Sequence, residues 1–339
     1  MNKVLLIGPE YFGINESVEK AFLDKGFKTT VINFSESYPV NYKTKITHGL
    51  LNKLGIGYFM KRYNDEINKD IVEIYRSLEP DIVIIIKGHK IYQETLNEMK
   101  NSKLILWMMD SVKRVNEIWG TINTYDYVFV FEEDDVSFLS SKGIKSYYLP
   151  LALDRNKYWP IKNRKELDIV FIGSLYPERI KVLKEIIREF PQKNIVIYGK
   201  FPSWKIQLMN INLRIGKYRK YFNIKSVNPK DINVIYSKSK VILNLHLNFS
   251  LSGCNLRFFE IAGTKSLQIV NRKHLIDTYF NMEELVFDSY EDLIRIIKNV
   301  FDDNIETTSI IDKVYNEAII SHTYTNRIDV ILNYLSKKN

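Results

Sequence analysis

The sequence predicts an α/β fold with two doubly wound parallel sheets that face each other across a cleft. Three observations support it. Short apolar runs typical of strands alternate with helical patterns, the alternation restarts after a break near residue 150, and 339 residues suit two domains of ordinary size. Strands separated by helices form βαβ units, and these units build parallel sheets.

The first half of the chain contains five strand-like runs. The run Ile82–Ile86 is apolar throughout, which is typical of a parallel strand buried on both faces. We expect helices at about 17–25 and up to Leu78, the second one after a basic, aromatic segment at about 40–65. The expected strands are 3–7, 29–34, 82–86, 104–109 and 127–131.

The chain changes character at Leu149-Pro150, where a charged segment that includes Pro160 suggests a linker over 154–166. The strand and helix pattern then begins again, so we expect a second Rossmann-like half. Its expected strands are 168–172, 194–198, 240–245 and 267–270, and its expected helices are 178–190, 255–262 and 290–301. The segment at about 311–339 reads as helical.

The domain boundaries follow from this pattern. We expect a first domain over 1–153 and a second over 154–319. The helix at about 320–339 is long enough to pack back on the first domain.

Composition limits the class of protein. With 45% hydrophobic and 26% charged residues, the chain has the balance of a globular protein. No apolar run reaches the length of a membrane span, and the strand-like start does not suggest a signal peptide. The single cysteine, Cys254, excludes an intrachain disulfide. We therefore expect a cytoplasmic protein.

The net charge of +9 fits phosphorylated small molecules, an anionic membrane surface or nucleic acid as partners, and equally a surface that is simply rich in lysine. The densest basic run, 217–225, has no nucleic-acid recognition motif around it, so we expect no nucleic-acid partner.

Several catalytic motifs are absent from the sequence. No G-x-G-x-x-G follows an expected strand, and there is no G-K-[ST] phosphate loop and no G-x-S-x-G nucleophile turn. The five histidines have no metal-ligand spacing, and no Asp-x-Asp pair occurs, so we expect no metal site.

A polar loop joins a strand to a helix between Asn244 and Gly263. The unpaired N–H groups and the dipole at that helix start favour an anion such as a diphosphate. Glu260, between one and two turns into the helix, could accept hydrogen bonds from both ribose hydroxyls of a nucleotide. The alternative is that Gly253 only forms a turn and that Arg257 and Glu260 form a surface ion pair.

Residues 255–263, Asn-Leu-Arg-Phe-Phe-Glu-Ile-Ala-Gly, resemble the donor-site motif of bacterial spore-maturation-type glycosyltransferases, which belong to the wider group 1 family with the GT-B fold. Other segments resemble parts of these enzymes in the same order: 168–174, Arg179, 198–200, 236–244 and 322–327, with 107–110 as the best match in the first half.

The resemblance implies a metal-independent transferase that needs no cofactor. It would hold a nucleotide-sugar donor, most simply a UDP-sugar, in the second domain and the acceptor mainly in the first. Glu260 would bind the ribose, Asn255 and nearby backbone would meet the diphosphate, and Arg179 or Lys200 would neutralise phosphate charge. The other implied donor-site positions are Gly173, Ser174, Gly199, Tyr236, Asn244, Gly253 and Arg257.

One position departs from the family pattern. Ser252 stands where the broader group often has a second glutamate, so inversion or retention at the anomeric carbon stays open.

An inverting enzyme also needs a base for the acceptor hydroxyl. Asp110 and His89 each follow an expected strand of the first domain, at the carboxyl edge where open α/β sheets bind ligands. We favour Asp110. The alternatives are that Asp110 caps a helix and that His89 is an ordinary loop histidine.

The sequence thus predicts a glycosyltransferase that moves a sugar to a hydroxyl of a glycan, glycolipid or protein, as in cell-surface glycan biosynthesis. We expect it at the cytoplasmic face, with peripheral contact to an anionic inner membrane. The alternative is a GT-B-like module that binds a nucleotide or glycan without catalysis.

Overall fold

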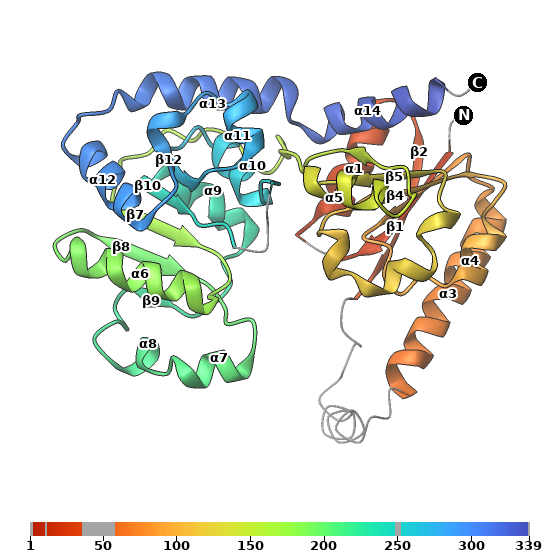
Figure 1. The fold of residues 1–339 in the computed structure, drawn as a ribbon, viewed down its shortest axis with the longest axis horizontal. Coiled ribbons are helices and arrows are strands. Elements are labelled where there is room, and N and C mark those ends of the chain that lie inside the picture. The colour runs from red at the N-terminus through yellow and green to blue at the C-terminus, as the bar shows by residue number, and fades with distance from the viewer. Residues whose placement is uncertain (1–2, 11, 36–57, 248–251, 338–339) are drawn as a thin grey trace. The chain divides into compact units, whose positions relative to one another are not determined.

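The computed structural model describes residues 3–10, 12–35, 58–247 and 252–337. The chain forms two compact units (Figure 1). Unit 1 comprises Met1–Pro150 together with Tyr324–Asn339, and unit 2 comprises Leu151–Thr323. Among the described residues, no helix is both long and apolar enough to cross a membrane.

Unit 1 contains a six-stranded sheet in the order β2-β1-β3-β4-β5-β6, in which all pairings are parallel. The apolar residues of the central strands are buried because they face helices on both sides. The strands are β1 (Lys3–Pro9), β2 (Lys28–Phe34), β3 (Ile82–Ile86), β4 (Lys103–Met108), β5 (Tyr127–Val130) and β6 (Tyr147–Tyr148).

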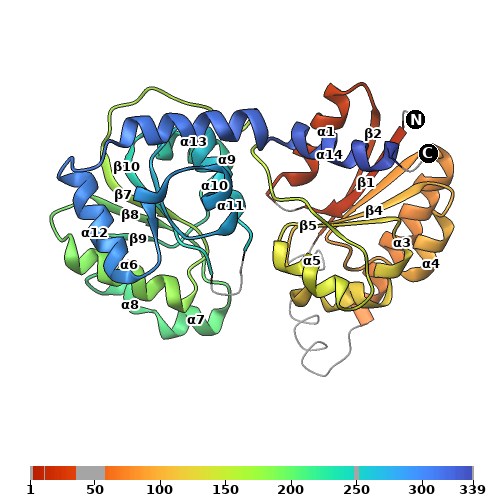
Figure 2. The ribbon, with the colours of Figure 1, turned by 45° about the horizontal axis from the view of Figure 1, so that its top comes forward.

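The helices of unit 1 come from both ends of the chain. They are α1 (Ile14–Asp24), α3 (Tyr58–Leu78), α4 (Gln93–Glu98), α5 (Glu133–Ser140) and α14 (Tyr324–Ser336), with short 3₁₀ turns at Val112–Arg114, Asn116–Gly120 and Ile122–Thr124. Helix α14 lies beside α1 in both views (Figures 1 and 2). Tyr127 donates a hydrogen bond to the carbonyl of Tyr334 at 3.2 Å, which anchors α14 to the sheet.

Unit 2 contains a second six-stranded parallel sheet in the order β12-β11-β10-β7-β8-β9. Its strands are β7 (Leu167–Ile172), β8 (Ile195–Tyr198), β9 (Phe222–Asn223), β10 (Ser239–Asn244), β11 (Gln268–Asn271) and β12 (Val286–Phe287). Its helices are α6 (Pro177–Glu189), α7 (Trp204–Met209), α8 (Asn212–Ile215), α9 (Pro229–Ser237), α10 (Leu256–Gly263), α11 (His274–Tyr279), α12 (Tyr290–Phe301) and α13 (Thr307–Ser321), with a 3₁₀ turn at Glu283–Leu285.

The fold confirms the two parallel-sheet halves expected from the sequence, with local differences. Helix α1 begins three residues before the expected start, after Gly13 at φ 68°. The expected C-terminal helix is two helices separated by His322 and Thr323. Of the basic segment at about 40–65, residues 36–57 lie outside the described residues.

The segment expected to be a linker, 154–166, belongs to unit 2 and is partly packed. Tyr158 is buried, and the Trp159 N–H donates to the Asn233 side chain at 3.4 Å. Just before it, Leu153 pairs with Thr323 in a short parallel bridge, and the Leu153 N–H donates to the His322 carbonyl at 2.8 Å. The two ends of unit 2 are therefore joined to each other.

We expect Gly199→Ala to destabilise unit 2, because a Cβ there would lie 2.1 Å from the Gly173 carbonyl oxygen, and a backbone atom cannot move away cheaply. Overpacking of this kind costs about 1–3 kcal/mol, which lowers Tm by roughly 2–10 °C in a unit of this size. Gly120→Ala is the matched control, since nothing lies within 4 Å of its added Cβ. Equal melting temperatures for the two variants by calorimetry would contradict the tight approach of these loops.

Candidate functional site

The carboxyl ends of β7 and β8 form two loops that pack against each other. Gly173 follows β7 and donates its N–H to the Tyr198 carbonyl at 3.0 Å, and Leu175 N–H donates to the Lys200 carbonyl at 2.9 Å. Gly199 fits only because it lacks a Cβ. The Lys200 side chain is exposed. The structure therefore brings together Gly173, Ser174 and Gly199, with Lys200 contributing backbone.

Arg179 lies in the first turn of α6 and reaches back over these loops. Its Nε donates to the Leu245 carbonyl at 2.8 Å, and its Nη1 donates to the Ser174 carbonyl at 3.1 Å. Burial lowers the pKa of Arg179 to about 10, and the charge of nearby Arg257 acts in the same direction. The guanidinium is thus held in place by hydrogen bonds to two backbone oxygens.

The loop after β10 holds a buried histidine that sequence analysis set aside. The His246 N–H donates to the Asn271 side chain at 2.7 Å, and its Nε2 accepts from the Asn255 N–H at 3.1 Å. The acceptor role of Nε2 assigns the ring proton of the neutral form to Nδ1. Nδ1 is buried and has no hydrogen-bond partner among the described residues.

The surroundings of His246 are cationic. Burial lowers the pKa of His246 well below its usual value, and the charges of Lys273 and Arg179 lower it further. His246 is therefore neutral at physiological pH and presents an N–H donor beside two cations. Such a group of donors suits an anionic oxygen.

Helix α10 begins at an N-cap made by Asn255. The Asn255 Oδ1 accepts from the Phe258 N–H at 3.0 Å, and its Nδ2 donates to the Asn244 Oδ1 at 2.9 Å. Asn244 also donates to the Gln268 side chain at 3.2 Å, so Asn244 and Asn255 join the end of β10 and the start of β11 to the start of the helix. The side chain of Asn255 is committed to this framework. An anion would therefore meet the N–H groups in the first turn of α10 rather than the Asn255 side chain. The buried Gly253 lies just before this turn.

Arg257 and Glu260 form an ion pair inside unit 2, at 2.8 Å between Nη1 and Oε2. Arg257 Nη1 also lies 3.2 Å from the hydroxyl oxygen of Tyr236, to which it donates. Burial opposes the charge of Arg257, but the Glu260 carboxylate raises its pKa above the ordinary value. Burial raises the pKa of Tyr158, and the charge of Glu260 raises it further, so Tyr158 keeps its proton beside the carboxylate.

The two candidate bases lie at neighbouring strand ends of unit 1. Asp110 follows β4 and is shared between Lys87 and Arg114, each at 3.3 Å. His89 follows β3 and is buried, with its ring centroid 5.5 Å from that of Phe34. The Lys87–Asp110 ion pair joins the two strand ends.

A buried carboxylate also fixes the loop that holds Asp110. Asp135 of α5 accepts from the Ser111 hydroxyl and from the Val112 N–H, both at 2.9 Å. The expected helix cap at this loop is made by Ser111, whose hydroxyl accepts from the Lys113 N–H at 3.4 Å. Asp110 therefore keeps its carboxylate for Lys87 and Arg114.

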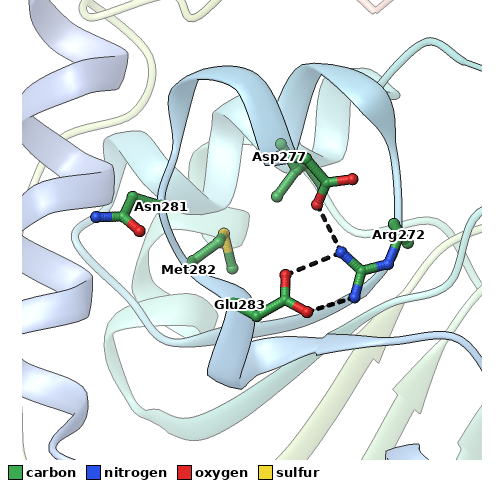
Figure 3. A pocket seen from close by; sticks show the side chains of 6 residues that line it. Arg272, Asp277, Asn281, Met282 and Glu283 are labelled. Carbon is green, nitrogen blue, oxygen red and sulfur yellow. Dashed lines mark hydrogen bonds and ion pairs between the residues drawn. The ribbon is translucent and has the colours of Figure 1, made fainter.

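A pocket of about 170 Å³ is lined by residues between Arg272 and Glu283, which follow β11 (Figure 3). Its guanidinium, Arg272, points toward Asp277 and Glu283, at 2.8 and 2.5 Å, and also pairs with Asp288 at 3.0 Å. Hydrogen bonding to Glu283 and Asp288 raises the pKa of Arg272. Three carboxylates around one cation leave the pocket unsuited to a diphosphate.

Sequence reasoning missed three residues of the unit 2 site: His246, Lys273 and Tyr158. His246 and Lys273 each lie two residues after a parallel strand, and that position was a usable signal. Tyr158 lies in the segment interpreted as a linker, and nothing in the local pattern indicates its burial against Glu260. Among the described residues, no group of three His, Cys, Asp or Glu side chains could hold a metal ion.

Comparisons with solved structures show which proteins share this fold. Sucrose-phosphate synthase from Thermosynechococcus elongatus matches with a TM-score of 0.69 at 10% identity over 100% of both chains. Trehalose-6-phosphate synthase OtsA matches with 0.70 at 13% over 100% of both. HepE from Anabaena, in complex with UDP-glucose, matches with 0.68 at 11% over 99% of this chain and 100% of that one. At these identities the likeness establishes the fold alone.

Comparison with family models adds a match over part of the chain. No curated protein matches, but residues 179–333 match the model of the glycosyl transferase-like family. The match begins at Arg179 in α6 and includes β10, α10 and the loop between them. Together with the two parallel-sheet units, this partial match indicates a transferase enzyme that is similar to group 1-like glycosyltransferases.

Proposed function

We propose that this glycosyltransferase transfers the sugar of a UDP-sugar to a hydroxyl group on a glycan, glycolipid or protein. One observation carries the donor half of the proposal: Arg179, Lys273, the Nδ1–H of His246 and the start of α10 converge at the carboxyl edge of the unit 2 sheet. The UDP-glucose complex of HepE, which has the same fold, supports UDP as the nucleotide.

The proposed chemistry uses these donors on the leaving group. As the bond between the sugar and the diphosphate breaks, negative charge grows on the phosphate oxygens. Arg179 and the first-turn N–H groups of α10 are held in advance by the backbone, so they stabilise that charge without rearrangement. This requires no metal.

Glu260 is the proposed ribose ligand. Its carboxylate is held by Arg257 on one side and lies near Tyr158 on the other, so its orientation is fixed before a nucleotide arrives. A carboxylate in this position can accept hydrogen bonds from vicinal hydroxyls.

The acceptor is proposed to bind at the carboxyl edge of the unit 1 sheet. Asp110 is the favoured base and His89 the second candidate. To take a proton, Asp110 must give up part of its contact with Lys87 or Arg114.

We further propose a cytoplasmic enzyme of cell-surface glycan biosynthesis, related to the spore-maturation type, that contacts the anionic inner membrane peripherally. The net charge of +9 supports that contact.

UDP should raise the melting temperature of the protein more than GDP, ADP, CMP or dTDP, because a ligand that binds only the folded state stabilises it by mass action.

Arg179→Gln should weaken UDP binding about 10- to 100-fold in calorimetry, because a hydrogen bond to a charged group usually contributes this much to affinity. Arg188→Gln, an exposed arginine on the same helix, is the control and should bind like the wild type.

Equal UDP affinities for the Arg179 and Arg188 variants would overturn the proposed diphosphate site. Turnover of a UDP-sugar separates the enzyme from a non-catalytic binding module, which would bind UDP with the same affinity and release no sugar.

Glu260→Gln should reduce UDP affinity at least tenfold and also lower the unfolding free energy by about 1–3 kcal/mol, because Arg257 loses its carboxylate in a buried setting. The matched control is Glu185→Gln, which breaks an i,i+3 pair with the exposed Arg188 and should change stability by less than about 0.5 kcal/mol. A Glu260 variant that binds UDP normally but melts early would leave Glu260 a structural role only.

His246 should make stability depend on pH. Its folded-state pKa is lowered, so below about pH 6.5 the unfolded chain binds a proton that the folded chain does not. The unfolding free energy should therefore fall as the pH drops from 7.5 to 5.5, with a slope of up to about 1.4 kcal/mol per pH unit. His246→Gln keeps an acceptor for the Asn255 N–H and should remove this part of the slope. Parallel denaturation curves for wild type and variant across the range would contradict a neutral, buried His246.

A further inference from the structure

Two short helices of unit 2, α7 and α8, expose most of their apolar side chains. Both views show them beside α6 and β9 at one end of the unit (Figures 1 and 2). The apolar patch consists of five residues, with exposed fractions of 68% for Trp204, 57% for Leu208, 79% for Met209, 52% for Ile211 and 75% for Ile215. Large apolar side chains that are exposed together often mark a surface that binds a partner or a membrane.

Packing within the unit does not account for these side chains. Helix α7 buries none of its residues, and α8 buries only Leu213. Trp204 and Leu208 are four residues apart and lie on one face of α7, as neighbours on a helix do. The two helices therefore present an apolar surface outward while Leu213 anchors them to the unit.

Exposed cations lie along the same stretch of chain as the apolar patch. Between Lys200 and Lys225 the sequence has seven Lys and Arg residues and no Asp or Glu. All seven side chains are exposed, and within the described part of the chain none forms an ion pair: Lys200, Lys205, Arg214, Lys217, Arg219, Lys220 and Lys225. This segment holds much of the positive excess of a chain whose net charge is +9.

We propose that the 200–225 surface binds an anionic lipid bilayer, with the apolar patch entering the headgroup region and the surrounding cations pairing with lipid phosphates. Amphipathic helices with exposed Trp and Leu on one side and Lys or Arg on the other lie in the membrane interface in this way. The inference rests on the membrane contact proposed above and names the surface that makes it. It does not depend on the transfer reaction.

Charge and residue type favour a bilayer over other partners. A second copy of the chain would bring two surfaces of the same charge together, which opposes association. A nucleic acid would satisfy the cations, but Leu208, Met209 and Ile215 offer it no stacking ring or hydrogen bond. A bilayer satisfies both the charges and the apolar side chains.

The test is sedimentation of the full-length protein with vesicles of phosphatidylcholine containing 30–40% phosphatidylglycerol (roughly the charge density of an anionic leaflet) and with vesicles of pure phosphatidylcholine. Binding to the anionic vesicles should weaken with added salt. Lys217→Gln with Lys220→Gln should reduce the partition coefficient about 25-fold, since each cation near the surface contributes about fivefold. Trp204→Ser with Met209→Ser should reduce it at least tenfold through lost apolar burial.

Matched controls alter exposed residues elsewhere. Ile320→Ser, whose side chain is 69% exposed on α13, and Lys61→Gln with Lys69→Gln on α3 should bind vesicles like the wild type. All variants should bind UDP equally, so loss of vesicle binding is separable from failure of the donor site.

Equal sedimentation of the patch and control variants would overturn the proposal, as would absence of wild-type binding to anionic vesicles. Binding to a single-stranded oligonucleotide in place of vesicles would assign the surface to nucleic acid. Dimerisation that the Trp204 and Met209 changes abolish, without vesicle binding, would assign it to a second copy.

Discussion

Parallel strand pairing is the constraint on which both units depend. In a parallel sheet every strand must be followed by a crossover, so all carboxyl ends and the loops that leave them collect along one edge. Every pairing in the two described sheets is parallel. This is why Arg179 after β7, His246 after β10 and Lys273 after β11 meet although they belong to distant segments. The same rule brings Lys87 to Asp110 in unit 1.

The unit 2 site gathers positive charge. Arg179 and Lys273 lie beside a histidine whose pKa they lower, and the Glu260 carboxylate is paired with Arg257. Cations that lie close together attract an anion. A bound diphosphate would be such an anion. Nucleotide binding and stability of the unit should therefore be coupled, while Tyr236 and Tyr158 hold the Arg257–Glu260 pair in either state.

The sequence predicted what depends on local pattern. Ile82–Ile86 was placed to the residue because a continuous apolar run has few alternatives, and α10 was placed to within one residue because Gly263 marks its C-terminal end. Helix α1 was placed too late because its N-cap is Gly13 in a left-handed conformation, with no side-chain signal. The break at His322 depends on burial among the rings of Phe259 and Phe280, which no local pattern reveals.

The site was predictable to a lesser extent. The neighbourhood of Arg179, Asn244 and Glu260 followed from strand ends and family resemblance, although their individual roles are still predictions. The His246 ring accepts a hydrogen bond from the Asn255 N–H. The cations that lower the pKa of His246 lie in segments that follow two other strands. Only strand order decides such contacts. For the same reason, the paired state of Asp110 depends on β3 and β4 being neighbours.

The bridge between Leu153 and Thr323 has a consequence for how the gene could be rearranged. The chain enters and leaves unit 2 at adjacent backbone positions. Unit 2 is therefore a continuous insertion between β6 and α14 of unit 1. A segment whose ends lie together can be excised, transplanted or given new termini without breaking its own sheet. Unit 2 could thus have been acquired, or be exchanged between enzymes, as a single segment whose ends need only a short connection.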